Sequence, residues 1–543
     1  MVKKFKNGQK KFIIFGLLII ALFFVVRLVN LTILPIFADE AIYIRWSQVM
    51  RAEPTLRFLP LSDGKQPLFM WLTIPFLKIF SDPLLAGRFL SVLAGLGSLV
   101  GITLIAWLLF KEKRIVLMTA LFYAVVPFFV FFDRLALVDS LLAMFSLWLC
   151  GLSLLLIRYQ RWDLAMVTGM ILGGALLTKS PAIFFALFLP AALLSSFAPL
   201  SGASEGFRST KEEKIPRMSI RGASFLPFKK KNNFLKILAL WMIVWLFGFG
   251  LYNFLLRLGP GFQMIAIRNK DYLFSLKEIL SHPLDPLKPH FGDLRQWLPN
   301  LLTWPIFWAS IGGILVGLRK KLKITLFLLI WFVIPLLAQA VFAKVFTPRY
   351  ILFTVWPLLL FAAFFLDWLC VKMKRKSWII IILFLIFLIP AFNYDWLLLF
   401  NPERAPLPRN LRNGHLEEWT AGQGLKESAV FFKERARDGS VFVGTEGFFG
   451  TLPDGLQIYL EGVANIRVIG VGWPVVGVHP SLVNSLVDNE VYLLVNQSRL
   501  NLLPQNNGLM LVREYPKAAW PDGHRDKLLL FQLDKNYWQS KRQ

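Results

Sequence analysis

The chain has 543 residues, of which 56% are hydrophobic and 15% aromatic, and this content excludes a soluble multidomain protein. Its net charge of +27 does not indicate a nucleic-acid partner. Most of the excess lies in short segments between apolar runs, and no basic face with interleaved aromatic residues lies outside them. We therefore expect the positive charge to orient the chain in a membrane and to attract anionic lipid headgroups, so that membrane lipids are partners and nucleic acid is not.

Eleven apolar runs are predicted to cross a bilayer as helices, because most reach or approach the ~20 apolar residues that a crossing needs. The first run follows a basic head but shows no small-x-small cleavage pattern, and Arg27 and Asn30 follow directly after the apolar stretch that ends at Val26. We therefore expect an uncleaved first helix rather than a signal peptide. The runs cover residues 16–29, 83–110, 115–132, 135–157, 162–178, 181–198, 235–258, 298–318, 324–343, 350–368 and 377–396.

Clusters of Lys and Arg occupy every second connection between these runs. The positive-inside rule places all of them in the cytoplasm, so we expect a multi-pass protein of the cytoplasmic membrane with its N-terminus inside and its C-terminal part outside. The remaining connections face outward and hold a separate group of charges. The basic clusters are Lys3–Lys11, Lys111–Arg114, Arg158–Arg161, Arg208–Lys236, Arg319–Lys323 and Lys372–Lys376.

Three segments interrupt the pattern of helices and short loops. The first outer loop, 37–82, begins FADEAIYIRWSQVM, whose spacing predicts an amphipathic helix at the membrane interface. Residues 199–234 are rich in Ser, Gly and Lys, which predicts a flexible basic loop in the cytoplasm. Residues 259–296 form a second outer loop, in which we expect short helices.

The composition changes near residue 397. The runs VFVGT, IRVIGV, VYLLV and LLLFQL predict strands at 441–445, 466–471, 491–495 and 528–533, with helix-like stretches such as Gly424–Arg437 between them. The sequence therefore predicts an α-helical polytopic membrane domain over residues 1–396. A small extracytoplasmic α/β domain is expected to follow over residues 397–543.

Two acidic positions on the outward side are candidates for chemistry. Asp39 and Glu40 open the interfacial helix, where adjacent side chains diverge by about 100°, so one can face a cavity while the other caps the helix, or both can simply cap it. Asp139 lies about one turn inside an apolar helix, where an ionisable group normally faces a cavity or a partner. Arg134, five residues earlier, could be that partner.

Cations lie at the same outward level of other helices, at Lys65, Lys179 and Arg349. Two carboxylates and several cations near one membrane surface suit a substrate with a phosphate leaving group. The cations would bind the phosphate, and a carboxylate would take a proton from the acceptor hydroxyl or amine.

Other kinds of site have weaker support. Cys150 and Cys370 both lie inside apolar runs, so neither a disulfide framework nor a cysteine-based metal site is expected. The five histidines show no metal-ligand spacing, although a divalent metal at the outer loop of His282 and His290 stays open. No Walker or GxGxxG motif indicates a nucleotide site.

The motifs and their order resemble the polyprenyl-phosphate-sugar-dependent glycosyltransferases of the GT-C fold, in the group of glycosyltransferase family 39 that contains the bacterial aminoarabinose transferase and the protein mannosyltransferases. The resemblance covers about 400 residues of the membrane region. It rests on RLVNLTILPIFADEAIYIRWSQ (27–48), GKQPLFMWL (64–72), FFDRLALVDSLLAMF (131–145), LLTKSPAIF (176–184) and TPRYILFTVWPLL (347–359).

The resemblance implies a role for each matching residue. Asp39 matches the acidic residue of the first outer loop, the usual candidate base or acceptor-activating group in such enzymes, and Asp139 matches a second acidic position. The cations expected to hold the donor phosphate are Lys65, Arg134, Lys179 and Arg349. The residues expected to line the substrate pocket are Glu40, Tyr43 and Tyr350. One departure affects the phosphate site, since Gly64 and Gln66 flank Lys65 where relatives have a polar residue and a proline.

We therefore expect a membrane enzyme that transfers a sugar from a polyprenyl-phosphate donor to a glycolipid, a cell-envelope glycan or a protein. A carrier or flippase for lipid-linked glycans is the main alternative, and it would be expected to show mid-membrane charges and broken helices in paired halves. A structural or assembly factor that kept the fold and lost activity is a second alternative.

Overall fold

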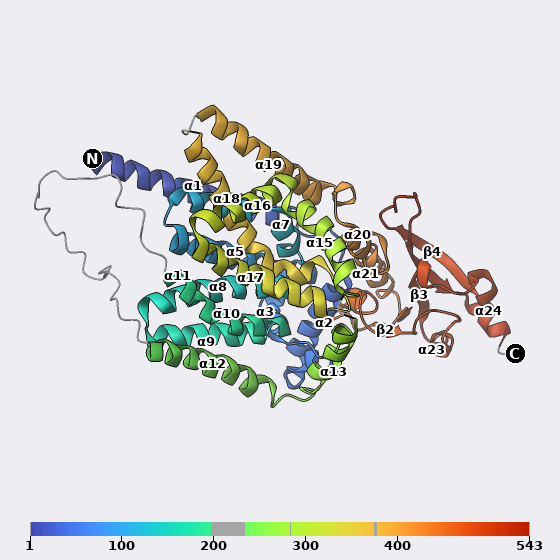
Figure 1. The fold of residues 1–543 in the computed structure, drawn as a ribbon. Helices are drawn as coiled ribbons and strands as arrows, with labels where there is room; N and C mark the ends of the chain where they lie inside the picture. Colours follow the sequence, from blue (N-terminus) through green and yellow to red (C-terminus); the bar gives the residue numbers. More distant parts are fainter. Residues whose placement is uncertain (1, 197–233, 283, 374–376, 542–543) are drawn as a thin grey trace, which may run out of the picture.

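The computed structural model describes residues 2–196, 234–282, 284–373 and 377–541. A bundle of apolar helices makes up most of the molecule, and a smaller α/β domain lies at the end opposite the N-terminus (Figure 1). The predicted basic loop 199–234 lies outside the described residues, apart from Phe234, the first residue of a helix.

Seven helices in the described ranges are long and apolar enough to cross a membrane, or up to nine spans if each of two bent helix pairs counts as one. The chain is therefore a multi-pass membrane protein. The bent pairs are α6 (Lys113–Val125) with α7 (Pro127–Asp133) and α15 (Leu287–Leu302) with α16 (Trp304–Lys320). The seven are α1 (Val2–Leu28, apolar from Gln9), α5 (Pro83–Phe110), α8 (Val138–Tyr159), α12 (Phe234–Leu256), α17 (Leu322–Phe342), α18 (Leu352–Lys372, with Pro348–Ile351 before it) and α19 (Ser377–Phe400).

Four of the eleven predicted spans differ from continuous long helices. The run 115–132 bends by 55° between α6 and α7. The run 162–178 is the short helix α9 (Trp162–Leu176), and the run 181–198 is divided between α10 (Ile183–Phe188) and α11 (Leu193–Ser196) by a 3-10 turn that contains Pro190. The run 298–318 bends by 107° where α15 meets α16 at Thr303, whose φ is +67°. Proline in these turns removes a backbone donor, which explains why an apolar run need not be one helix. The count of eleven crossings stays a prediction.

Small residues let the helices pack closely. A Cβ on Gly313 of α16 would lie 2.0 Å from the carbonyl oxygen of Phe361 in α18. A Cβ on Gly169 of α9 would lie 2.8 Å from the carbonyl oxygen of Val244 in α12. Close backbone approach of this kind is the usual way in which helices associate inside a bilayer.

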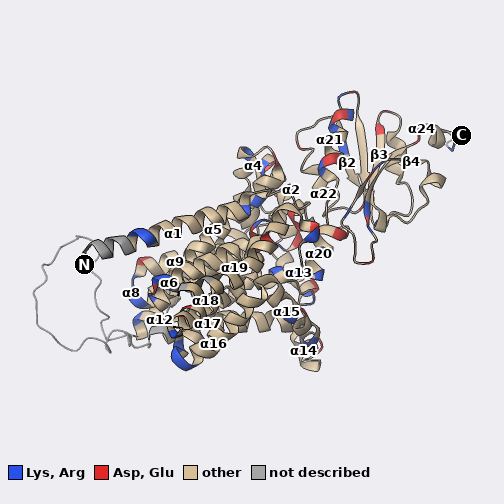
Figure 2. Ribbon diagram, turned by 90° about the horizontal axis from the view of Figure 1, so that it is seen from above, with Lys and Arg blue, Asp and Glu red and all other residues tan. Residues whose placement is uncertain are grey.

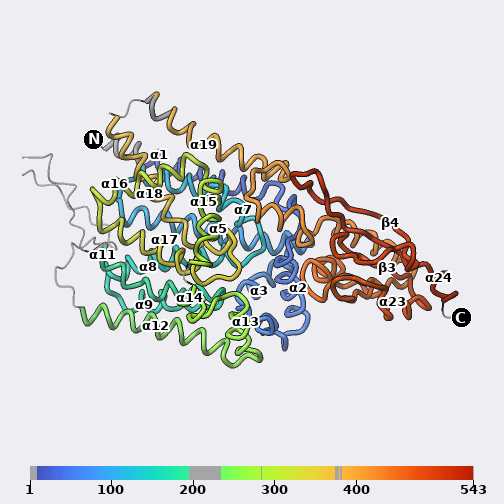
Figure 3. The backbone as a smooth tube through the Cα atoms, turned by 45° about the vertical axis from the view of Figure 1, so that its right-hand side comes forward, coloured from blue at the N-terminus to red at the C-terminus, as the bar shows by residue number. Residues whose placement is uncertain are grey.

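A layer of short helices lies between the bundle and the C-terminal domain (Figure 3). The predicted interfacial helix is α2 (Ala38–Ala52), and it contacts α3 (Leu68–Thr73) and α5 of the membrane part. The C-terminal domain covers its other side, since Gln48 Nε2 donates to the carbonyl oxygen of Ile458 at 2.9 Å. The helix α13 (Met264–Tyr272) lies in the same layer (Figure 3). Two further short helices of the outer loops are α4 (Phe76–Ile79) and α14 (Leu276–Ser281).

The C-terminal domain is an α/β domain, as predicted, with five strands in the order β2-β1-β3-β5-β4. Strand β1 pairs in parallel with β2 and β3, while β5 pairs antiparallel with β3 and β4. The sequence analysis missed β4, an edge strand whose mixed polarity shows no clear alternation. The strands are β1 (Val441–Thr445), β2 (Ile466–Gly470), β3 (Glu490–Asn496), β4 (Leu509–Pro516) and β5 (Lys527–Leu533). The helices are α20 (Arg409–Arg412), α21 (Leu425–Arg435), α22 (Asp454–Gln457), α23 (Pro480–Ser485) and α24 (Lys535–Ser540).

Charges divide between the two ends of the bundle. Figure 2 shows Lys and Arg gathered at the end away from the C-terminal domain, around the ends of α6, α8 and α16. These are the basic clusters 111–114, 158–161 and 319–323 of the sequence analysis. The structure thus brings the predicted cytoplasmic connections to one end. The compartment that this end faces stays a prediction.

Candidate functional site

Five charged side chains from five separate parts of the chain meet at the end of the bundle nearest the C-terminal domain. We call them the outer charge cluster. Asp39 comes from the first turn of α2 and Asp139 from the first turn of α8. Lys65 and Lys179 come from segments that precede short helical turns, and Arg349 lies in the 3-10 turn Pro348–Ile351 that leads into α18. The sequence analysis had proposed every member. The cluster consists of Asp39, Lys65, Asp139, Lys179 and Arg349.

Asp39 lies between two cations. Its Oδ2 accepts a hydrogen bond from Arg349 Nη1, and its Oδ1 lies 3.8 Å from Lys65 Nζ. The side chains of all three are 17–23% exposed, so a ligand can reach them. Burial alone would raise the pKa of Asp39, but the charges of Arg349 and Lys65 outweigh that effect and hold the pKa well below its usual range. Without a ligand, the Asp39 carboxylate is therefore ionised.

Asp139 forms the second pair of the cluster. Its Oδ1 accepts a hydrogen bond from Lys179 Nζ at 2.6 Å. Its Oδ2 is buried and has no hydrogen-bond partner among the described residues. One face of Asp139 therefore has an acceptor atom that a substrate hydroxyl could satisfy.

Two tyrosines connect the members of the cluster. The Tyr350 ring lies 4.3 Å from Lys179 Nζ and 5.2 Å from Arg349 Cζ, so it joins the two ion pairs. The Tyr43 ring lies 5.4 Å from Lys65 Nζ, within the range of a cation–π contact. Burial raises the pKa of the Tyr43 hydroxyl above its usual range, so this residue stays neutral. The structure thus places both predicted tyrosines at the cluster.

The unusual segment around Lys65 is held on both sides. Gly64 has a φ of +68°, and a Cβ there would lie 2.7 Å from the carbonyl oxygen of Met264 in α13. Gln66 Nε2 donates to Ser180 Oγ at 2.7 Å, one residue after Lys179. The glycine and glutamine that depart from the family pattern therefore fix Lys65 against the second outer loop and against the segment of Lys179.

Glu40 does not line the substrate pocket, and that prediction is wrong. Its carboxylate is fully buried and forms a bidentate pair with Arg88, with both N–O distances 2.8 Å. The same two oxygens also accept from the backbone N–H groups of Ala136 at 2.6 Å and Phe37 at 2.9 Å. Because each oxygen already accepts two hydrogen bonds, Glu40 joins α2 to α5 and to the segment before α8 instead of contacting a ligand.

Arg134 does not bind phosphate in this arrangement, and it does not pair with Asp139. Its guanidinium is buried and donates to the carbonyl oxygens at the end of α1, including Arg27 at 2.9 Å and Asn30 at 2.8 Å. A cation at the carboxyl end of a helix satisfies carbonyl groups that have no partner within the helix. Arg134 is therefore a structural cap, and its prediction as a donor-binding residue is wrong.

The histidines of the second outer loop do not form a metal centre. His282 is exposed and lies 3.4 Å from Asp285, whereas the buried His290 has its Nδ1 2.7 Å from the carbonyl oxygen of Ala340. No group of three or more His, Cys, Asp or Glu side chains that could hold a metal ion occurs in the parts of the chain that the structure describes. The carboxylates of the outer charge cluster are paired with cations instead.

The sequence analysis missed a contribution from the C-terminal domain. Residues 413–422 run beside the start of α2, where Ala38 N donates to Thr420 O at 3.0 Å and Gly422 N donates to Ile36 O at 2.9 Å. The His415 ring packs on Phe37 at 4.3 Å. Burial lowers the pKa of His415 to about 3, so its ring is neutral at physiological pH. No short-range signal could reveal these contacts, because they join residues almost 400 positions apart.

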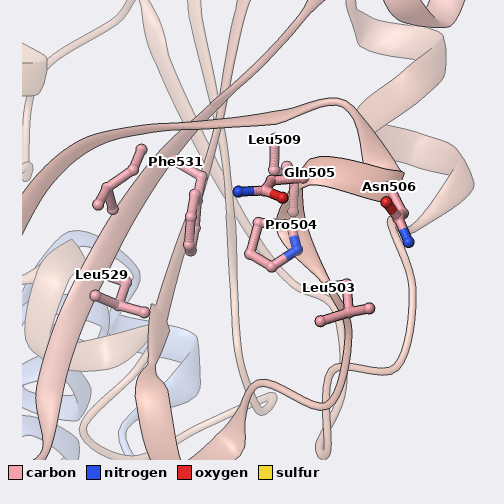
Figure 4. Close-up of a pocket in the computed structure, with 8 residues that line it drawn as sticks. Leu503, Pro504, Gln505, Asn506, Leu509, Leu529 and Phe531 are labelled. Carbon is pink, nitrogen blue, oxygen red and sulfur yellow. The ribbon is translucent and has the colours of Figure 1, made fainter.

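A groove in the C-terminal domain has a different character. It lies between β4, β5 and the segment 503–506, and apolar side chains provide most of its lining (Figure 4). Its residues include Leu503, Leu511 and Phe531, and none of them belongs to the outer charge cluster.

Comparisons with known proteins support the resemblance. Residues 64–204 match the family model of the dolichyl-phosphate-mannose-protein mannosyltransferases. No curated protein matches the sequence.

Solved structures share the fold over almost the whole chain. ArnT from Cupriavidus metallidurans in the apo state is 13% identical with a TM-score of 0.55, covering 98% of this chain and 99% of that chain. The same ArnT bound to undecaprenyl phosphate gives 13% identity and a TM-score of 0.55, with coverages of 95% and 97%. The Archaeoglobus fulgidus oligosaccharyltransferase in complex with Zn and sulfate is 11% identical with a TM-score of 0.50, covering 95% of this chain and 72% of that chain. The chain is thus a multi-pass membrane protein with an ArnT-like GT-C fold, and its resemblance to the glycosyltransferases of family 39 is confirmed.

Proposed function

We propose that the protein is a membrane glycosyltransferase that transfers a sugar from a polyprenyl-phosphate donor to a glycolipid, a cell-envelope glycan or a protein. The reaction takes place at the outer charge cluster, on the outer face of the cytoplasmic membrane. The observation that carries this proposal is the position of Asp39 between Arg349 and Lys65. The fold shared with an ArnT structure that holds undecaprenyl phosphate supports the donor class.

The cations of the cluster can bind a phosphodiester. Lys65 Nζ lies 3.4 Å from Asp63 as well as 3.8 Å from Asp39, and Asp63 also pairs with Arg268, which in turn contacts Asp271. With these neighbours the cations and carboxylates balance, so a phosphate binds there by taking the place of carboxylates at Arg349 and Lys65. Charge-assisted hydrogen bonds from these two side chains then hold the phosphate.

Donor binding changes the chemistry of Asp39. In the free protein the two cations stabilise the carboxylate so strongly that it is a weak base. When the phosphate takes their hydrogen bonds, the pKa of Asp39 rises toward its ordinary value and the carboxylate can accept a proton. Arg349 and Lys65 thus stabilise the phosphate leaving group, while Asp39 accepts the proton of the acceptor.

The transfer step then balances as follows. The acceptor oxygen or nitrogen attacks the anomeric carbon of the sugar and loses its proton to Asp39. The bond between that carbon and the phosphate oxygen breaks, and the electron pair leaves on polyprenyl phosphate, whose new charge Arg349 and Lys65 stabilise. Attack from the side opposite the phosphate inverts the anomeric centre. Asp139, held by Lys179, offers its free Oδ2 to a substrate hydroxyl and orients it.

The test is release of the lipid product. Purified protein is incubated with radiolabelled undecaprenyl-phosphate-linked mannose, glucose or aminoarabinose and with an envelope extract as acceptor source. Wild-type protein is expected to release free undecaprenyl phosphate and to transfer label to the extract, and Arg349→Ala to do neither. A carrier or flippase would leave the sugar–phosphate bond intact, and so would an inactive assembly factor. Wild-type protein that releases no undecaprenyl phosphate from any of the three donors would contradict the proposal.

A further inference from the structure

An arginine in the C-terminal domain contacts two tryptophan rings. Arg499 follows strand β3, and its Cζ lies 3.4 Å from the centre of the Trp419 ring and 4.6 Å from the centre of the Trp473 ring. Both distances are within the range of a cation–π contact. We call the side chains of Trp419, Arg499 and Trp473 the stack.

The guanidinium of Arg499 has little other compensation. Its Nε is buried without a hydrogen-bond partner among the described residues, and the nearest carboxylate oxygen, Glu446 Oε1, is 3.8 Å away. Glu446 already accepts two hydrogen bonds from Asn496, each 2.7 Å long. Buried donors without a partner are uncommon in proteins, so this one leaves a hydrogen bond that a bound molecule can make.

Exposed apolar side chains lie in the loops around Trp473. They lie in two loops that follow β1 and β2, and Gly447 N of the first loop donates to Gly472 O of the second at 2.9 Å. The carboxyl ends of neighbouring parallel strands are where α/β sheets bind ligands. The side chains, all at least 60% exposed, are Phe448, Phe449, Trp473 and Val476.

The inner end of the stack adjoins the outer charge cluster. Trp419 directly precedes Thr420, whose carbonyl oxygen accepts from the backbone N–H of Ala38, the residue before Asp39. The backbone beside Trp419 is therefore hydrogen-bonded to the start of α2, one residue from Asp39.

The composition of the two loops favours a sugar over a lipid surface. Residues 446–450 and 471–478 contain no Lys or Arg, and Glu446 is their one charged residue, whereas attraction to anionic lipid headgroups needs basic side chains. Sugar rings have an apolar face that packs on an indole or phenyl ring and hydroxyls that bind guanidinium and carboxylate groups. We propose that Trp473, Phe448 and Phe449 form a platform that binds a sugar ring of the acceptor while Arg499 binds its polar substituents. This inference rests on the proposed function, because it supplies the acceptor of that reaction.

Saturation-transfer NMR on purified full-length protein tests the platform, with mannotetraose and chitotetraose as probes. We expect wild-type protein to bind at least one probe and Trp473→Ala to bind it about tenfold more weakly, the loss expected for one ring contact. Leu503→Ala is the control, since Leu503 is exposed at 69%, against 60% for Trp473, but lines the groove of Figure 4. This variant should bind the probe as wild type does. Wild-type protein that binds neither probe, or a Trp473→Ala variant that binds as wild type does, would overturn the inference.

Two further measurements separate the other outcomes. Release of undecaprenyl phosphate by the wild-type protein tests the proposed function alone. Normal release with no binding of either oligosaccharide therefore refutes the sugar platform but not the glycosyltransferase activity.

A fluorophore attached to Val476→Cys, in nanodiscs whose lipid headgroups carry nitroxides, measures whether these loops contact the membrane. Wild-type protein, whose two cysteines are Cys150 and Cys370, gives the background quenching. We expect no quenching beyond that background, and strong quenching would place these loops at the bilayer and overturn the proposal.

Discussion

Asp39 and Glu40 are neighbours on α2, and both pair with arginine, but their surroundings differ. The Glu40–Arg88 pair is fully buried, and each Glu40 oxygen accepts from a backbone N–H as well as from the guanidinium. The Asp39–Arg349 pair is partly exposed, and the Asp39 carboxylate contacts two cationic side chains, Arg349 and Lys65. A buried pair whose hydrogen bonds are all made within the protein stabilises the fold. In a partly exposed pair, the cations can bind a substrate in place of the carboxylate.

The largest expected effect is the loss of turnover when Asp39 can no longer accept a proton. Asp39→Asn keeps the shape of the side chain and removes the proton acceptor, so turnover should fall by roughly 10²–10⁴, the usual contribution of a positioned base. Protein yield should stay close to wild type. Rates of label transfer from the donor check this prediction. If Asp39→Asn retains near-normal turnover, the base lies elsewhere and Asp139 becomes the leading candidate.

The matching change at Glu40 should affect stability instead. Glu40→Gln leaves the Arg88 charge buried without a carboxylate, and breaking a buried pair in this way costs about 3–5 kcal/mol. Thermal unfolding in detergent should show a lower midpoint and a lower yield, while turnover per folded molecule stays near wild type. A stable Glu40→Gln protein without activity would reverse the assignment of the two residues.

Removing one cation of the cluster should weaken donor binding. Arg349→Ala and Lys65→Ala each lose charge-assisted contacts worth roughly 1.5–3 kcal/mol, or about ten- to a hundredfold in affinity. Titration with an undecaprenyl-phosphate-linked sugar measures the change. Arg134→Lys is the informative comparison, because Arg134 caps α1 and should change stability more than affinity. Unchanged donor affinity in both alanine variants would remove Arg349 and Lys65 from the phosphate site.

A smaller effect is expected from the backbone before Lys65. Gly64→Ala forces a Cβ into a left-handed conformation against α13, at a cost of about 1–2 kcal/mol, and displaces Lys65. Donor affinity should fall, although less than in Lys65→Ala. The control is Gly292→Ala in the second outer loop, where nothing lies within 4 Å of the new Cβ. Equal donor affinity in both glycine variants would show that this segment does not position Lys65.

The smallest expected signal is a shift in pH dependence. The pKa of Asp39 is lowered in the free protein, so the pair contributes stability that is present above the unfolded pKa of about 3.9 and lost as pH falls through the folded value. The acid limb of kcat/KM, which reports the free enzyme, should therefore lie below pH 4. The acid limb of kcat, which reports the enzyme with donor bound, should lie closer to the ordinary pKa of an aspartate side chain. Two coincident limbs would show that donor binding does not release Asp39.

Much of the cluster could be predicted because the membrane restricts where charges can lie. Alternating basic clusters assign the remaining charges to the other end, and Asp39, Lys65, Asp139, Lys179 and Arg349 do meet there. Glu40 and Arg134 have the same outward position in the sequence, so the same argument selected them. Their internal partners are Arg88 and the end of α1, which no local spacing reveals. The contacts of residues 413–422 were hidden for the same reason.

A structure of the protein with undecaprenyl phosphate tests the central claim most directly. The account predicts the phosphate within hydrogen-bond distance of Arg349 and Lys65, with the Asp39 carboxylate released from Arg349 and facing the space where an acceptor enters. A phosphate bound elsewhere, with the Asp39–Arg349 pair intact, would contradict it.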